Sequence, residues 1–135
     1  MNEPLHPTGW AAPRGYAHGV VAPAGGRVIV TAGQIGWDPA SARFTTDDFA
    51  EQAAQALRNV VAVLRAGGAQ PEHLVRLTWF ITSARDYHDA RASLGERYRE
   101  IIGRHYPAMS VVVVSALLEP RARVEIEATA VVPAE

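Results

Sequence analysis

Two stretches of the chain carry apolar residues at the spacing of an α-helix. The first begins near Thr45 and Asp48, which fit a capping box, and Gly67-Gly68 stand where it would end. The second begins at Ser83 with Asp86. The first apolar stripe consists of Phe49, Ala53, Ala56, Leu57, Val60, Val61 and Leu64. The second consists of Tyr87, Ala90, Leu94, Tyr98 and Ile101. The pattern therefore predicts two helices, each with one buried face.

Other stretches are rich in β-branched residues or alternate between apolar and polar positions, as strands do. The predicted strands are residues 16–22, 27–32, 74–82, 110–118 and 123–132, with a hairpin loop at 23–26. Residues 1–15 contain several prolines and glycines and are predicted to form an irregular N-terminal arm. The order β-β-α-β-α-β-β predicts a single α+β domain over residues 1–135, a mixed sheet with two helices on one face.

The run from Ser110 to Leu118 raises a packing problem. Val111 to Val114 are apolar on both faces of the predicted strand, yet two helices cover only one face of a sheet. The other face must be buried by something outside this chain. Self-association is the simplest solution.

Composition narrows the chemistry. The 135 residues include no cysteine, and all 13 basic residues are arginine. Thiolate and disulfide chemistry, Cys-based metal sites and Schiff-base lysines are therefore excluded. The net charge of −1 argues against a nucleic-acid partner. The five histidines form no local metal motif, so no metal site is expected. The start of the chain does not resemble a signal peptide and no apolar run is long enough to span a membrane, so no membrane partner and a cytoplasmic location are expected.

Glu125 and Glu127 lie two residues apart on a predicted strand, so both project from one face, and Arg123 is expected to project from it too. One interpretation is a solvated edge with an ion pair along the strand, which would stabilise little. The other is a carboxylate that orients water or substrate.

Six motifs, in this order, resemble the RidA/YjgF (reactive intermediate deaminase, RutC-like) family over residues 11–132. They are Gly15-Tyr16, Gly33-Gln34, Gln52 to Asn59-Val60, Gly67-Gly68-Ala69, Tyr106-Pro107-Ala108 and Val124-Glu125-Ile126-Glu127-Ala128. The resemblance implies a chorismate-mutase-like fold and a homotrimer with small-molecule clefts between subunits. It also implies hydrolysis of an enamine or imine by water, without metal or organic cofactor.

The resemblance assigns roles to individual residues. Glu125 would be catalytic, because the first glutamate of the Val-Glu-Ile-Glu segment helps hold the water. The substrate-binding residues would be Tyr16, Gly33, Gln34, Tyr106, Met109 and Arg123. In active members an arginine after the Pro-Ala pair clamps the substrate carboxylate, but here that residue is Met109. Three further positions depart from the family pattern: Ala32, Gly95 and Val111.

A thioether cannot hold a carboxylate by charge, so ordinary 2-imino acid deaminase activity is expected to be weak or absent. Three functions stay open. One is a divergent hydrolase whose substrate lacks the α-carboxylate or is bound by another arginine, Arg14, Arg76 or Arg123. The second is a non-catalytic small-molecule binder or sensor on the same trimer, and the third is a structural hub.

Overall fold

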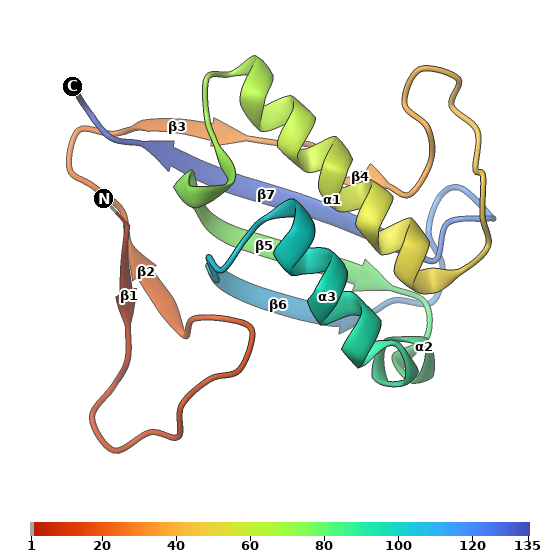
Figure 1. Ribbon diagram of the computed structural model, residues 1–135, viewed down its shortest axis with the longest axis horizontal. Helices are drawn as coiled ribbons and strands as arrows, with labels where there is room; N and C mark the ends of the chain where they lie inside the picture. Colours follow the sequence, from red (N-terminus) through yellow and green to blue (C-terminus); the bar gives the residue numbers. More distant parts are fainter. Residues whose placement is uncertain (1) are drawn as a thin grey trace.

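A mixed β-sheet with helices on one face organises the computed structural model, which describes residues 2–135 (Figure 1). The strands are β1 (Glu3–Leu5), β2 (Gly19–Val21), β3 (Arg27–Val30), β4 (Gln34–Ile35), β5 (Leu74–Ile81), β6 (Ala108–Val113) and β7 (Val124–Val132). The helices are α1 (Phe49–Ala66), α2 (Ala84–Asp89) and α3 (Arg91–Ile101), with a 3-10 turn at Pro71–His73. The main sheet has the order β3-β7-β5-β6, and β4 also pairs with β7. Only β5 and β6 run parallel, so the predicted α+β class is confirmed.

Helix α1 forms where the apolar stripe predicts it. Its first turn is capped by Asp48, whose side chain accepts a hydrogen bond from the Glu51 N–H. Thr46, rather than Thr45, supports this start by accepting the Asp48 N–H through its hydroxyl. The expected capping box is therefore wrong, although the helix is right. Gly67 ends α1, as predicted.

The second predicted helix is two helices. Ser83 caps α2 by accepting the Asp86 N–H, as its position indicates. The chain then leaves helical geometry at Ala90, whose N–H bonds to the carbonyls of both Asp86 and Tyr87. Helix α3 starts at the next residue and buries Leu94 and Tyr98. The structure therefore has three helices where two were expected.

The N-terminal region differs most from the prediction. Residues 3–5, expected to be irregular, form β1 and pair antiparallel with β2 in a separate ribbon that projects from the main sheet in Figure 1. The predicted hairpin between 16–22 and 27–32 does not form, because β3 pairs with β7 instead. A proline is tolerated in β1 because this short ribbon has free edges. The Ala17 N–H donates to the Pro107 carbonyl at 3.0 Å, which ties this region to the start of β6.

Strand β6 lies at one end of the strand order in the single chain, and not between two strands. It ends at Val113, and the apolar residues beyond it belong to the loop that leads to β7. Leu118 in this loop is 96% exposed. The predicted strand 110–118 was therefore too long.

The two faces of the sheet are buried unequally. Leu77, Ile126 and Ala130 face the helices and belong to the hydrophobic core. The opposite face carries no helix in the described residues, and Val28 and Val30 on β3 are 61% and 71% exposed there. An uncovered apolar face of this kind is what the sequence led us to expect. The homotrimer itself stays a prediction.

Candidate functional site

A cleft of about 560 Å³ lies on the helix side of the sheet, beside β6. Its walls come from the N-terminal region, β5, α2, α3 and β6. Met109 pairs with Leu77, and Val111 pairs with Trp79, in the parallel register of β5 and β6. Because Leu77 and Trp79 are buried on the helix side, Met109 and Val111 project to that side as well. Both residues line the cleft.

All four tyrosines of the chain, Tyr16, Tyr87, Tyr98 and Tyr106, line this cleft and give it aromatic walls. Tyr98 and Tyr106 stack with ring centroids 5.4 Å apart, and Tyr16 lines the cleft near them. The Tyr98 hydroxyl donates to the His105 carbonyl at 2.6 Å. Burial raises the pKa of Tyr98, and the neighbouring Tyr106 raises it further. Tyr98 therefore stays protonated, and its hydrogen bond fixes its ring in the wall of the cleft. The Tyr16 and Tyr106 hydroxyls make no hydrogen bond within residues 2–135.

A second group of predicted residues lies on the opposite face of the sheet. Glu125 alternates with the buried Val124 and Ile126, so it points away from the helices. Gly33 packs directly against its carboxyl group: a Cβ on Gly33 would come within 2.7 Å of the Glu125 Cδ. Gln34 follows in β4, which pairs with β7 at Ile126. The structure thus brings Gly33 against Glu125, whereas Gln34 is paired with Ile126 and its side chain belongs to the other face of the sheet.

Two buried residues of α1 hold the loop that follows Gly33 and Gln34, one through its amide and one through its backbone. Asn59 donates through its Nδ2 to the carbonyls of Ile35 and Trp37, at 3.1 and 3.0 Å. Gln52 is fully buried, and its backbone packs so closely on Gly36 that a side chain there would collide with it. Both residues belong to the motif that runs from Gln52 to Asn59, and they position the residues around Glu125.

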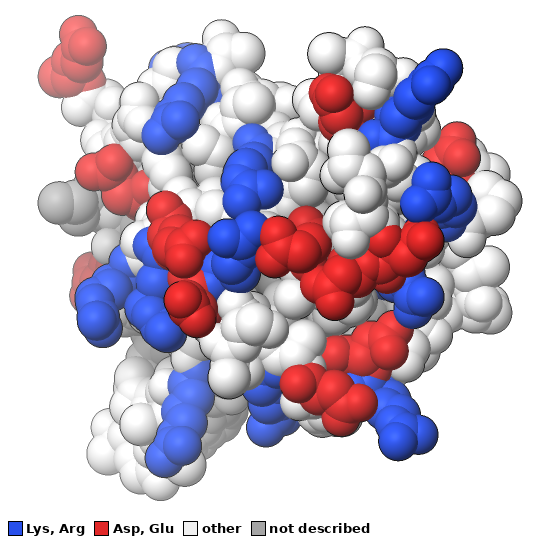
Figure 2. All heavy atoms as spheres, turned by 45° about the vertical axis from the view of Figure 1, so that its right-hand side comes forward, with Lys and Arg blue, Asp and Glu red and all other residues white. Residues whose placement is uncertain are grey.

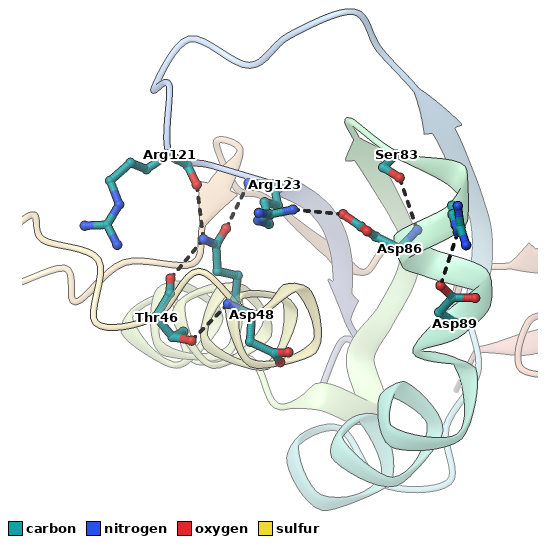
Figure 3. A network of polar contacts seen from close by, with 9 residues as sticks. Thr46, Asp48, Ser83, Asp86, Asp89, Arg121 and Arg123 are labelled. Carbon is teal, nitrogen blue, oxygen red and sulfur yellow. Dashed lines mark hydrogen bonds and ion pairs between the residues drawn. The ribbon is translucent and has the colours of Figure 1, made fainter.

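Arg123 belongs to neither group. It precedes β7, its N–H donates to the Gln52 Oε1 at 2.8 Å, and its guanidinium bonds to Asp86 at 3.1 Å (Figure 3). Asp86 itself is fixed by the Ser83 cap of α2. The expectation that Arg123 projects beside Glu125 is wrong, because the regular alternation of β7 begins one residue later.

The cleft also contains a residue that the sequence analysis did not single out. Arg91, the first residue of α3, lines it together with Arg14, which was one of the candidate replacements for the missing arginine. Arg91, Leu94 and Tyr98 recur at helical spacing, and both of the latter face the cleft. This spacing was the available signal for placing Arg91 on the cleft side.

Within residues 2–135, no group of three or more histidine, aspartate or glutamate side chains is arranged to hold a metal ion. In the same part of the chain, no helix has both the length and the apolar character needed to cross a membrane.

Comparison with known proteins identifies the family. The sequence model described as Endoribonuclease L-PSP matches residues 9–132. The 2-iminobutanoate/2-iminopropanoate deaminase of Homo sapiens is 33% identical over 105 residues, which cover 78% of this chain and 73% of that protein.

Solved structures agree with this match. The Rid-family protein YyfB of Yersinia pestis, described as of unknown function, has a TM-score of 0.83 and 29% identity over 97% of this chain and 98% of its own. The YjgF gene product of E. coli has a TM-score of 0.69 and 34% identity, with 86% and 87% of the two chains covered. This chain belongs to the RidA/YjgF family.

Proposed function

We propose that this protein is a cofactor-free hydrolase for carbon–nitrogen double bonds, or the equivalent enamines, and that it works as a homotrimer with ligand clefts between subunits. The observation that carries the proposal is the division of the site residues between two faces of one sheet. Met109, Tyr16 and Tyr106 border the cleft on the helix side, whereas Glu125 and Gly33 lie on the other side. A second copy of the chain is the simplest way to bring the two groups to one substrate.

The apolar character of the open face supports the trimer. Val28, Val30 and Val112 are exposed in the single chain. Val112 lies on β6 and is adjacent in sequence to Val111, which lines the cleft. Contact with other copies would remove these side chains from water. It would also set the open face of one subunit against the edge strand of another.

The chemistry requires few groups. Water adds to the imine carbon while a carboxylate takes up its proton and passes it to the imine nitrogen. The resulting carbinolamine then loses its C–N bond, its hydroxyl proton is transferred to the nitrogen, and a carbonyl compound and ammonia are released. Glu125 is the carboxylate proposed for this step, because it faces the open side and lies against Gly33, where any side chain would displace it. Relatives named as 2-imino acid deaminases support the reaction class.

Met109 separates this chain from a small-imino-acid deaminase. A methionine on the cleft floor offers contact area but no charge for a carboxylate next to the reacting carbon. We therefore expect ordinary 2-imino acids to be poor substrates. The alternative is a non-catalytic binder on the same trimer. Methionine in place of the arginine at position 109 is compatible with this alternative too.

Ammonia release decides between the hydrolase and the binder. Imines generated from small amino acids by an amino-acid oxidase should be hydrolysed no faster with this protein than in buffer alone. Imines and enamines with larger apolar groups should be hydrolysed faster than in buffer. Fast hydrolysis of small 2-imino acids would contradict the role given to Met109, and no hydrolysis of any compound would favour the binder.

A further inference from the structure

Some arginines of this protein are paired with acidic side chains and others are not. Those that form ion pairs are Arg85, Arg97, Arg121 and Arg123. Arg14 and Arg91, which line the cleft, form no ion pair within residues 2–135. A guanidinium left without an acidic partner at a cleft is available to a ligand anion.

The acidic residues lie elsewhere. Figure 2 shows acidic side chains in a band across one face of the molecule, with arginines among them. A separate hollow at the start of α1 and along α2 is lined by Asp47, Asp48, Asp86 and Asp89. The cleft beside β6 has no acidic residue among its lining within residues 2–135. The charge of its walls therefore favours an anion.

Much of the remaining lining of the cleft is apolar or aromatic. Leu94, Met109 and Val111 line it together with the stacked Tyr98 and Tyr106. A volume of about 560 Å³ lies within the range of small-molecule sites. Such a lining favours flat or branched apolar bodies over a two- or three-carbon chain.

A buried donor adds to this picture. Trp79 lines the cleft and is 4% exposed, yet its indole N–H has no hydrogen-bond partner within residues 2–135. A buried donor without a partner is costly. A ligand oxygen that reached it would supply the missing bond.

We propose that the cleft selects an organic anion with a ring-sized apolar body, and that Arg91 of α3 holds the charge in place of residue 109 of β6. This inference names the substrate class of the function proposed above and rests on it. The positive charge that would bind the ligand is then on helix α3, and not on strand β6 at position 109. The ligand then lies with its apolar body against Met109, and Arg14 contributes from the N-terminal region.

Three ligands test the contribution of the charge and the contribution of the ring separately. Titration calorimetry on the full-length protein would compare 3-phenylpropanoate with 3-phenylpropanamide, which has the same shape without charge, and with propanoate, which has the charge without the ring. We expect 3-phenylpropanoate to bind about tenfold or more tightly than either, as one charge-assisted contact predicts. Equal affinity for the acid and the amide, or undetectable binding of 3-phenylpropanoate, would overturn the proposal.

Two variants assign the charge to its residue. Arg91→Gln should weaken 3-phenylpropanoate binding about tenfold and leave 3-phenylpropanamide unchanged. Arg85→Gln is the matched control, because Arg85 lies on the neighbouring helix with its side chain 89% exposed and outside the cleft. Wild-type affinity in Arg91→Gln, or an equal loss in both variants, would reject Arg91 as the clamp. Since binding is measured without turnover, failure of hydrolysis alone would sink the proposed function and leave this inference intact.

Discussion

In the proposed function, the two faces of the sheet would supply different halves of a reaction centre. The helix side offers a hollow with aromatic walls and two arginines, and it lacks acidic lining residues within residues 2–135. The open side carries Glu125, which lies against Gly33, and the exposed side chains of Val28 and Val30. The first half suits binding and the second suits proton transfer. The proposal therefore needs a second copy of the chain to bring the two halves to one substrate.

The same comparison explains why a single amino-acid change shifts the expected substrate. A cation at position 109 would lie on the strand floor of the cleft, whereas Arg91 lies on the helix wall. Moving a guanidinium from one wall to the other changes where a carboxylate is held relative to the reacting carbon. The catalytic half on the open face needs no change.

The largest effect is expected from Glu125→Gln. An amide cannot accept the proton of the attacking water, so hydrolysis should fall by about 100-fold or more. Glu127→Gln is the matched control, because Glu127 lies two residues along the same strand face and is exposed. The readout is ammonia release from whichever substrate is hydrolysed. Retained activity in Glu125→Gln, or equal loss in both variants, would move the proton acceptor elsewhere.

Gly33→Ala tests the open half by geometry instead of charge. The new Cβ would collide with the Glu125 carboxyl group and force it aside, which should lower kcat on the order of 10- to 100-fold. Gly19→Ala is the comparison, since Gly19 lies outside the cleft and its Cβ would meet only the Leu5 side chain, at 3.3 Å. If Gly33→Ala folds and keeps wild-type kcat, Glu125 is not held where the mechanism needs it.

Met109→Arg tests the cleft half. The substitution puts a charged fork on the strand floor, and hydrolysis of small 2-imino acids should rise about tenfold or more. The measurement is ammonia release from imines made by an amino-acid oxidase. Absence of any gain in a correctly assembled variant would mean that the cleft is remodelled beyond this single residue.

The smallest effect is expected from Arg123→Gln. Its ion pair with Asp86 is partly exposed, with 45% of the arginine side chain and 31% of the aspartate side chain accessible, so the free energy of unfolding should fall by at most about 1 kcal/mol. The backbone bond to Gln52 is unaffected. Thermal unfolding and kcat/KM are the measurements. A large loss of kcat/KM with unchanged stability would restore Arg123 as a substrate-binding residue.

Local patterns predicted the elements well and their partners poorly. Helix α1 was predictable because its apolar stripe recurs over many turns and glycine ends it. The pairing of β2 was not, because two short apolar segments around a glycine loop look like a hairpin, and the competing partner β1 lies in a proline-containing segment. The break at Ala90 gave no sequence signal, since alanine favours helix.

The same limit applies to the site. That Glu125 and Gly33 touch follows from the pairing of β4 with β7, which no spacing in the sequence reveals. Arg123 was misplaced because alternation was extended one residue too far. Helical spacing puts Arg91 in line with Leu94 and Tyr98, but the family resemblance places the clamping arginine at strand position 109 and gives no signal for a helix position.

The division of the site between two faces is tested most directly by the mass of the protein in solution. Size-exclusion chromatography with light scattering on the full-length chain should give three times the 14.5 kDa of one copy. Such a particle would allow the open face of one subunit to meet the cleft of another. A clean monomer near 14.5 kDa across the working concentration range would contradict both the trimer and the shared site.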